Sequence, residues 1–538
     1  MGSMAIAASP ALAQSNRSSG AIERTIPKQP PKTQVAPAIS APAPIVPTGS
    51  EITGRFILGA VHIEGATAFS QAELSPLFEP YLATEVDETV LNAIAARITD
   101  RYRKAGYLLS YATVPAQDVR AGIVRIVVVE GLVDTVRIEG TDKGRSTLEA
   151  IAAPLLKDVP LQDRTLERAM GLIRDMPGFT VADASLTRSD VDARRHTLKI
   201  IVARDPVRAL AYTDNRGTDE DGRIRLYSSA SLASLAMTGD ELRVDLFAIP
   251  GNHYRYVYGQ LLASVPLGHD GLRFAASASA GKQDQRIAGH EFDDSSTNLA
   301  ALLSYPVLRS RALTMVAKVA INDWRSIGEQ GSTRILRDRI RVARIGMDIS
   351  NEARTRLSGE FSLSRGLGFD GMTKKGDPLA SRPDASGRFT KAAFTLQLVH
   401  PISEKFTLQA MMAGQYSDRP LLSVEEFALG GNRLGRAFDF NTVTGDRGIG
   451  GGLELAYRIG DLKRGPQGIQ VFGYADGGAA FQAGSPAGIR RKNSLMSAGL
   501  GSRFTFAGIG FSAEAGVPVL SKGKSNSVRA FLSAYKAF

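Results

Sequence analysis

The sequence predicts an all-β transmembrane barrel of about 16 antiparallel strands, preceded by two small α+β modules. Three observations predict this architecture. A proline-rich segment separates a short apolar N-terminal stretch from the rest of the chain. Two similar patterns of strand, helix, strand and strand follow it. From residue 207 onward, helical periodicity gives way to repeated two-residue alternation of apolar and polar side chains.

The composition narrows the classes of function. The chain carries 65 Lys and Arg against 54 Asp and Glu, a net charge of +11, but the basic residues are scattered, so we expect no nucleic-acid binding. The absence of cysteine excludes thiol catalysis, disulfides and thiolate metal sites. The histidines are not spaced as metal ligands, and His290–Asp294 is interpreted as a solvated polar loop. We predict no catalytic residues, no metal site and no cofactor.

The N-terminal region is interpreted as a targeting signal followed by a linker. Residues 1–13 are expected to be the remnant of a signal peptide, because Ala11-Leu12-Ala13 fits the A-x-A cleavage pattern. A disordered alanine-rich terminus is the alternative. Residues 14–54 are proline-rich and are expected to form an extended linker. No stretch of the chain approaches the roughly 18–20 apolar residues of a membrane-spanning helix.

Residues 55–132 are expected to form the first module. Ala60–Gly65 alternates like a strand that ends in glycine, and apolar residues recur at helical spacing from Val90 to Tyr102. Gly106 follows where the helix is expected to stop. The two closing strands are expected over Leu108–Val114 and Ile123–Val129.

Residues 133–206 repeat the same order of elements. Val133–Gly140 is the opening strand, and the helix stripe consists of Leu166, Ala169, Met170 and Ile173, with Pro177-Gly178 as its break. Strands are expected over Val181–Ser189 and Thr197–Ala203. The chain therefore contains two tandem modules of one kind.

Residues 207–538 are expected to form the barrel. In Glu241–Phe247, for example, Leu242, Val244 and Leu246 alternate with charged side chains. A soluble sandwich also alternates, but here the polar face carries charges in strand after strand. A closed barrel with an apolar outside and a polar lumen leaves no unpaired strand edge in lipid. The glycine run Gly448–Gly452 lacks the Lys-Ser/Thr of a phosphate-binding loop and is interpreted as barrel strand.

Short motifs in the first module and in the barrel resemble those of a known family. The most specific segment is Leu429–Phe438, which contains Gly430, Gly431, Arg436 and Phe438 and is followed by Gly445 and Asp446. In the first module the motif residues are Pro115, Gln117, Asp118, Gly122, Glu130 and Gly131. In this order the motifs resemble the two-partner secretion outer-membrane transporters (TpsB type), whose modules are called POTRA domains. The resemblance covers about residues 55–538 and extends more distantly to the barrel-assembly factor BamA.

The resemblance implies a loop anchored inside the barrel. The family pattern is Gly-Gly, three residues, then Val-Arg-Gly-Phe/Tyr, in a long extracellular loop that folds back into the lumen. Here Gly435 replaces Val and Ala437 replaces Gly, which leaves the backbone of the loop tip open. The loop is expected over residues 418–447, between strands eleven and twelve. Asp476, on strand thirteen, is expected to receive Arg436.

The resemblance also implies a function. We expect a Gram-negative outer-membrane pore, with its POTRA arm in the periplasm, that secretes an adhesin or haemolysin-like partner without ATP. The partner is expected to be extended in transit and β-helical when folded, and the transporter to be a monomer in contact with outer-membrane lipid. A BamA-like insertase is the alternative, and a passive porin is disfavoured because porins need no periplasmic arm. The family's pore-plugging N-terminal helix is not predicted, since residues 15–50 lack a helical pattern.

Overall fold

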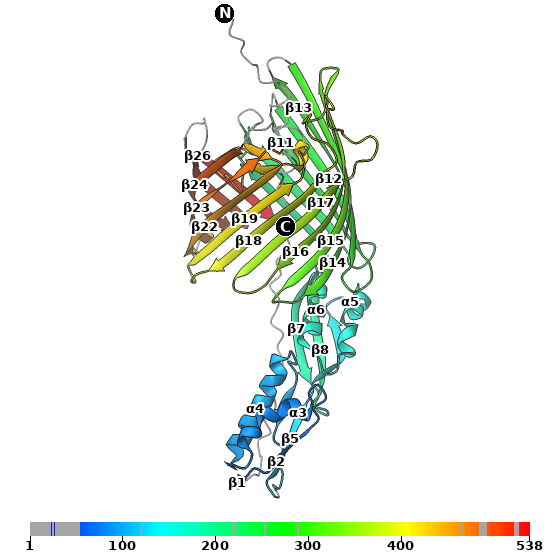
Figure 1. The fold of residues 1–538 in the computed structure, drawn as a ribbon, viewed down its shortest axis with the longest axis vertical. Helices are drawn as coiled ribbons and strands as arrows, with labels where there is room; N and C mark the ends of the chain where they lie inside the picture. The colour runs from blue at the N-terminus through cyan, green and yellow to red at the C-terminus, as the bar shows by residue number, and fades with distance from the viewer. Residues whose placement is uncertain are drawn as a thin grey trace, which may run out of the picture. The chain divides into compact units, whose positions relative to one another are not determined.

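The computed structural model describes Glu23, Ile26 and residues 54–538, with gaps at 120, 219–221, 252–253, 288–289, 463–464, 484–491 and 521–526. The expected signal-peptide remnant and nearly all of the linker lie outside the described residues. The chain forms two compact units, one built from residues 54–205 and the other from residues 206–538 with Glu23 and Ile26 (Figure 1). Within these ranges no helix combines the length and the apolar character needed to cross a membrane.

The first module packs helices against a small sheet. Its strands are ordered β2-β5-β4, with β2 parallel to β5, and α4 buries Leu91, Ile94, Ile98 and Tyr102. The expected strand at Leu108–Val114 is shorter in the structure, because a turn from Tyr107 to Ser110 precedes it. The elements are β1 (Phe56–Ile57), β2 (Ala60–Glu64), α3 (Gln71–Leu74), η1 (Ser75–Leu77), η2 (Glu79–Tyr81), β3 (Glu85–Val86), α4 (Glu88–Lys104), β4 (Tyr111–Thr113) and β5 (Ile123–Val129).

The second module has the same sheet topology, in the order β6-β8-β7. Backbone hydrogen bonds join the two modules: the N–H of Leu161 donates to Gly131 at 2.9 Å, and that of Asp163 donates to Gly106 at 2.7 Å. The sequence did not predict the first helix of this second module, over Arg145–Ala152. The elements are β6 (Leu132–Glu139), α5 (Arg145–Ala152), η3 (Ala153–Leu156), α6 (Asp163–Arg174), β7 (Phe179–Arg188) and β8 (Arg195–Arg204).

The second unit is a closed antiparallel barrel of 16 strands, which confirms the predicted fold class and strand number. The last strand, β26, pairs with the first, β9, and closes the sheet. The strands are β9 (Val207–Asp214), β10 (Arg225–Ala233), β11 (Glu241–Ile249), β12 (Tyr254–Pro266), β13 (Arg273–Ile287), β14 (His290–Arg309), β15 (Thr314–Gln330), β16 (Thr333–Ser350), β17 (Arg356–Gly366), β18 (Thr390–Pro401), β19 (Phe406–Ser417), β22 (Arg447–Gly460), β23 (Gln467–Phe481), β24 (Lys492–Phe506), β25 (Ile509–Leu520) and β26 (Arg529–Ala537).

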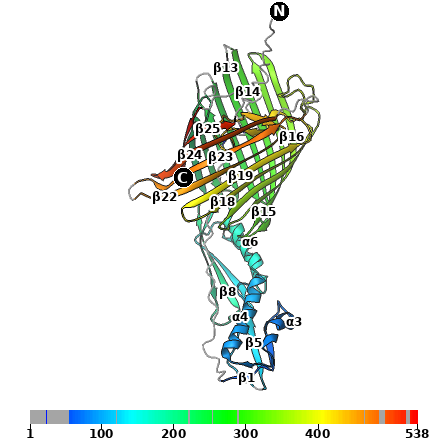
Figure 2. The same cartoon turned by 60° about the vertical axis from the view of Figure 1, so that its left-hand side comes forward.

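Two-residue alternation sets the two faces of the wall. Along β10 the side chains are buried and exposed in strict alternation. Arg225 and Tyr227 face the lumen, whereas Leu226 and Leu232 are exposed on the outer face. The glycines of Gly448–Gly452 lie in β22, as interpreted from the sequence. Figure 2 shows β22, β23 and β24 side by side in this wall.

Four neighbouring strands of the barrel are particularly long. β13, β14, β15 and β16 contain 15, 20, 17 and 18 residues, and Figure 1 shows them extending past their neighbours. The interpretation of His290–Asp294 as a loop was therefore wrong, because these residues begin β14. Their polar side chains obscure the apolar alternation, while hydrogen bonds to β13 and β15 maintain the strand.

Two described residues of the N-terminal segment lie against the lumen wall. The Ser296 hydroxyl donates a hydrogen bond to the Glu23 carboxylate. Ile26 packs on an aromatic cluster of β10, β11 and β12 that contains Tyr227, Phe247 and Tyr256. Glu23 and Ile26 therefore lie inside the barrel.

Candidate functional site: the loop held inside the barrel

The long loop connects β19 to β22, the eleventh and twelfth strands of the barrel. It contains a 3-10 turn, η4 (Ser423–Glu425), and a two-stranded hairpin of β20 (Phe427–Leu429) and β21 (Val443–Gly445). Its tip contacts lumen-facing side chains of β22, β23 and β25. The loop therefore folds back into the barrel.

Arg436 lies at the tip of this loop among three carboxylates of the wall. Its Nε donates to Asp476 Oδ2 at 3.0 Å, and its Nη1 donates to Glu454 Oε2 at 2.9 Å. Glu514 Oε2 lies 3.9 Å from Nη1, and the guanidinium carbon is 3.7 Å from the centre of the Tyr474 ring. The planar guanidinium thus makes directed bonds to two carboxylates while one face stacks on an aromatic ring.

Asp476, on β23, also holds the loop backbone. Its Oδ1 accepts hydrogen bonds from the N–H of Gly435 at 2.7 Å and of Arg436 at 3.2 Å. The Ser497 hydroxyl donates to the same oxygen. The Asp476 side chain is only 1% exposed, so each of these bonds replaces one that water would otherwise make.

The charges around Arg436 balance. Arg216 pairs with Glu514 and stacks 4.1 Å above the Phe531 ring, and Arg503 pairs with Glu454. Three arginines therefore face three carboxylates, counting Arg436, Arg216 and Arg503 against Asp476, Glu454 and Glu514. Removing one member leaves a partner unmatched in a largely desolvated place, which costs on the order of 3–5 kcal/mol.

Gly435 determines the backbone conformation of the loop tip, which the sequence did not predict. Its φ is +81°, in the left-handed region, and an added Cβ would lie 2.5 Å from Leu495 Cδ1. Valine, the family residue at this position, does not fit this conformation. Ala437 is 1% exposed, so the other departure from the family pattern is packed inside the tip. The backbone at the tip of this loop therefore takes a conformation that valine at position 435 does not fit.

The remaining loop motif residues pack the tip and close its base. Gly430 also has a positive φ, and an added Cβ would meet the Asp439 carbonyl oxygen at 2.0 Å. Gly431 lies against the Phe440 ring, and Phe438 joins a buried apolar cluster with Leu429. At the base, Gly445 packs against the backbone of Phe481.

Asp446 organises the base of the loop. It is fully buried and accepts a hydrogen bond from Arg382 Nη1 at 2.6 Å and from the N–H groups of Leu421 and Ala483 at 2.7 Å each. Arg382 comes from the β17–β18 loop and also bonds Glu426 at 2.7 Å. Asp446 therefore joins its own loop to the β17–β18 loop and to Ala483 after β23, at this mouth of the barrel.

The motif residues of the first module are structural. Glu130 is 6% exposed and accepts hydrogen bonds from the N–H groups of Thr67 and Ala68, at 2.7 and 2.8 Å, and from the Tyr102 hydroxyl at 2.7 Å. Burial alone would raise the pKa of Glu130, but these hydrogen bonds outweigh it and hold the pKa below its ordinary value. An added Cβ on Gly131 would lie 2.4 Å from that of Leu109.

The other motif residues lie around the turn before β5. Gln117 closes a ring with the backbone of Arg125, donating to its carbonyl and accepting from its N–H at 2.8 Å each. An added Cβ on Gly122 would lie 2.3 Å from the Ile57 carbonyl oxygen. Pro115 is partly buried and Asp118 is exposed. Gln117 and Gly122 therefore shape the turn that leads into β5.

Sequence reasoning missed several members of the loop site. Glu514, Arg216 and Arg382 were not identified, and Glu454 was given no role. The two-residue alternation of the barrel strands offered one usable signal. Glu514 is a charged residue at a lumen-facing position of β25. Nothing local to Arg382 indicates that its partners lie in another loop.

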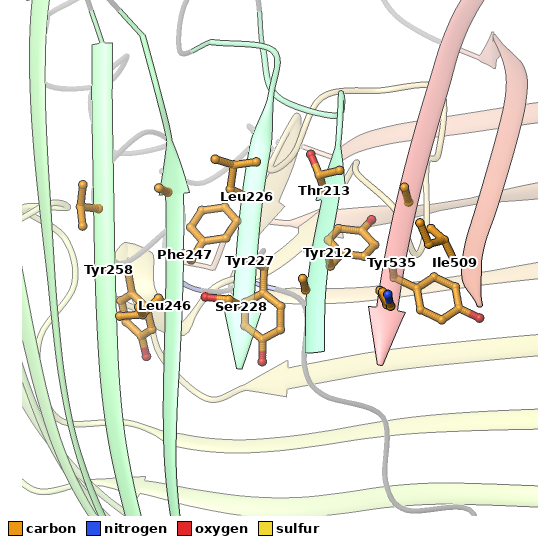
Figure 3. A pocket seen from close by; sticks show the side chains of 15 residues that line it. Tyr212, Thr213, Leu226, Tyr227, Ser228, Leu246, Phe247, Tyr258, Ile509 and Tyr535 are labelled. Atoms are coloured by element: carbon orange, nitrogen blue, oxygen red, sulfur yellow. The ribbon is translucent and has the colours of Figure 1, made fainter. Parts of the chain in front are cut away.

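The structure also contains a pocket of about 560 Å³ along the closing seam of the barrel. Figure 3 shows aromatic and aliphatic side chains of this pocket, among them Tyr212, Phe247 and Tyr535. Among the described lining residues Lys536 is the one charged group. Elsewhere in the described part of the chain, no three His, Asp or Glu side chains are grouped as for a metal ion.

A closed 16-stranded barrel that holds a long loop in its lumen and follows two POTRA-like modules defines an outer-membrane transport barrel. A family model described as haemolysin secretion/activation protein ShlB/FhaC/HecB matches residues 198–504, and one for the ShlB-type POTRA domain matches residues 56–131. The chain belongs to the ShlB/FhaC/HecB family. It is an outer-membrane protein, and the POTRA domains of this family lie in the periplasm.

Characterised relatives and solved structures agree with this assignment. The chain is 25% identical over 383 residues to the heme/hemopexin transporter protein HuxB of Haemophilus influenzae, covering 67% of this chain and 64% of HuxB. It is 23% identical over 440 residues to the hemolysin transporter protein HpmB of Proteus mirabilis, covering 78% and 75%. The fold matches that of CdiB from Escherichia coli with a TM-score of 0.75 at 19% identity over the whole of both chains. The chain thus spans somewhat less than two thirds of the HuxB relatives it matches.

Proposed function

We propose that this protein is the outer-membrane pore through which one partner exoprotein leaves the periplasm by two-partner secretion. Membership of this family and similarity to the transporters HuxB and HpmB support this function. The observation that carries it furthest is the loop tip in the lumen, where Arg436 bonds Asp476 and Glu454. A cation held by wall carboxylates is a contact that a passing polypeptide can displace and that can form again afterwards.

The proposed division of labour follows the chain. Residues 1–13 direct export and 14–54 form a linker, while 55–132 and 133–206 are the POTRA domains that receive cargo. Residues 207–538 form the pore, with 418–447 as the loop. The sheets β2-β5-β4 and β6-β8-β7 have edge strands, and an extended cargo segment can add to such an edge through backbone hydrogen bonds.

The energy source and partners are also proposals. The chain needs no ATP, because folding of the exported cargo outside the cell draws it forward. The cargo is an adhesin or haemolysin-like protein, extended in transit and β-helical once folded. The transporter acts as a monomer, without a catalytic step, cofactor or nucleic acid.

The alternative is a BamA-like insertase that assembles other barrels. Two modules, rather than a longer array, favour a dedicated exporter. Depletion separates the alternatives: loss of an insertase lowers the amounts of many outer-membrane proteins, whereas loss of an exporter removes one secreted protein.

Deletion of residues 56–205 tests the proposal directly. The truncated chain keeps the barrel, and we expect it to assemble in the outer membrane, as judged by heat-modifiable gel mobility. Secretion of the partner into the medium is expected to fall to background, because the cargo-binding edges are gone. Normal secretion by an assembled truncation would overturn the proposal.

A further inference from the structure

The outer face of β15 and β16 changes character abruptly along the strands. In the half of β15 nearer its start, the outward-facing pairs with β16 are aliphatic, with Val319 opposite Ile345 and Ile321 opposite Ala343. Val319 and Ile345 are 56% and 63% exposed, as expected of side chains that contact lipid. The next outward pair in register is Asp323 with Arg341, followed by Arg325 with Arg339. The aliphatic band therefore ends at a row of arginines.

The arginine patch consists of Arg325, Arg337, Arg339, Arg341 and Arg365. The last of these lies on β17 opposite Ala343, directly above the lipid-facing Leu363. The side chains of Arg325 and Arg337 are 52% and 55% exposed. On β14, the outward neighbours of Ile327 and Arg325 are the exposed hydroxyl residues Ser295 and Thr297. On β14 the patch therefore has neutral hydroxyl neighbours, and the acids Asp293 and Glu329 face each other one outward pair further along the strands.

The acids near the patch do not balance it. Asp323 Oδ2 accepts from Arg341 Nε at 3.0 Å, its Oδ1 accepts from Arg325 Nε at 3.1 Å, and Arg339 Nη2 lies 3.7 Å away. Arg337 is 3.4 Å from Asp377 in the β17–β18 loop. Two carboxylates therefore serve four of the arginines. The buried Nε of Arg339 has no hydrogen-bond partner among the described residues.

Chain direction places this patch in one leaflet. The POTRA domains of the family are periplasmic, so β9 starts at the periplasmic rim and every second strand runs outward. β15 is the seventh strand and therefore ends, at Gln330, on the cell surface. The arginine patch lies in that surface half, directly above the aliphatic band. A charged row at the surface end of a lipid-facing aliphatic band is where outer-leaflet headgroups are expected.

We propose that the arginine patch binds the phosphate-bearing headgroup of an outer-leaflet glycolipid. Guanidinium groups pair with phosphate oxygens in bidentate geometry, and juxtamembrane cations gain strength from a negatively charged lipid surface. The acyl chains of such a lipid lie along the aliphatic band, and Ser295 and Thr297 face its sugars. Because the patch is on the outer face of the wall, it is separate from the lumen and from the cargo path.

The test compares two triple variants of the full chain. Arg325→Gln, Arg337→Gln and Arg339→Gln together remove charge from the patch. Arg354→Gln, Arg356→Gln and Arg458→Gln remove the same charge from exposed positions at the periplasmic rim. Delipidated protein in detergent is mixed with diphosphoryl lipid A, and the bound fraction is measured by native mass spectrometry. Non-phosphorylated lipid A and phosphatidylglycerol are the comparison lipids.

We expect the patch variant to bind diphosphoryl lipid A at least about tenfold more weakly than the wild type, and the rim variant to bind like the wild type. An Arg-to-Lys version of the patch variant should restore most of the binding, because it restores the charge. Equal binding by patch variant and wild type would overturn the proposal, as would equal binding of the non-phosphorylated lipid or an equal loss in the rim variant. Only heat-modifiable, folded barrels are compared, and Arg337→Gln alone replaces the triple variant if that one does not fold.

Discussion

The tip of the barrel loop and the first POTRA domain each contain a buried carboxylate, Asp476 and Glu130, but the partners of these two carboxylates differ in kind. In the barrel, Asp476 binds the Arg436 guanidinium in addition to backbone and hydroxyl donors. In the arm, neutral donors on Thr67, Ala68 and Tyr102 donate hydrogen bonds to Glu130. A charge pair that faces the lumen can exchange partners with the charges of a passing chain. Neutral donors fixed in a folded core cannot, so Glu130 is part of a scaffold and Asp476 part of a releasable contact.

The largest expected effect is at the charge pair. Arg436→Ala or Asp476→Ala leaves the remaining charges unmatched, at a cost on the order of 3–5 kcal/mol. Since about 1.4 kcal/mol corresponds to a tenfold change in an equilibrium, the loop should leave its place in most molecules. We expect secretion of the partner to fall at least about tenfold while the barrel still assembles, measured as partner in the medium per heat-modifiable barrel.

A matched control lies in the same loop. Arg433 is exposed and has no ion pair within 4.0 Å in the described part of the molecule, so Arg433→Ala removes the same charge without breaking the anchor. It should secrete normally. Wild-type secretion from both Arg436→Ala and Asp476→Ala would show that the pair is not an anchor and would remove the contrast with Glu130.

A smaller effect is expected from the backbone of the tip. Gly435→Val restores the family residue, but it places a branched side chain at φ +81° and against Leu495. The strain is about 1–3 kcal/mol, so secretion should fall by less than in Arg436→Ala. Ala437→Gly, which also restores the family residue, removes one methyl group, costs about 1 kcal/mol and should secrete almost normally. Equal secretion by Gly435→Val and wild type would show that the tip tolerates both backbones.

Local patterns predicted the fold well because the barrel is built from a local rule. Alternation with a period of two residues, repeated after residue 207, depends only on neighbours in the chain, and it predicted 16 strands. The same rule failed where polar residues continue a strand, as at His290–Asp294 in β14. There, pairing with β13 and β15 maintains the strand, and that pairing is not visible in one segment.

The site was partly predictable for the same reason. Arg436 and Asp476 came from a resemblance, and the structure places their side chains in contact. Glu514 and Arg216 are separated by 298 residues and meet because the sheet closes on itself. Gly435 was read as a departure from the family pattern, and only its φ reveals why glycine stands there. Closure and backbone conformation are global properties, so they had to come from the structure.

The smallest expected effect concerns Glu130, the carboxylate in the core of the first POTRA domain. Its pH dependence sharpens the contrast with Asp476. Because the folded-state pKa of Glu130 is lowered, its contribution to stability is present above the unfolded pKa, near 4.3, and is lost as the pH falls through the folded pKa. Glu130→Gln removes the charged acceptor and should destabilise the first POTRA domain by about 1–3 kcal/mol at neutral pH. Hydrogen exchange of peptides from residues 60–130 in the full chain measures this. Wild-type protection should fall on acidification below about pH 4, while the variant starts lower and changes little with pH.

Secretion by Glu130→Gln at neutral pH should be reduced less than in Asp476→Ala, because the first domain remains folded and the lumen contact is intact. A loss of secretion equal to that of Asp476→Ala would show that the arm, too, depends on its buried carboxylate for more than scaffolding.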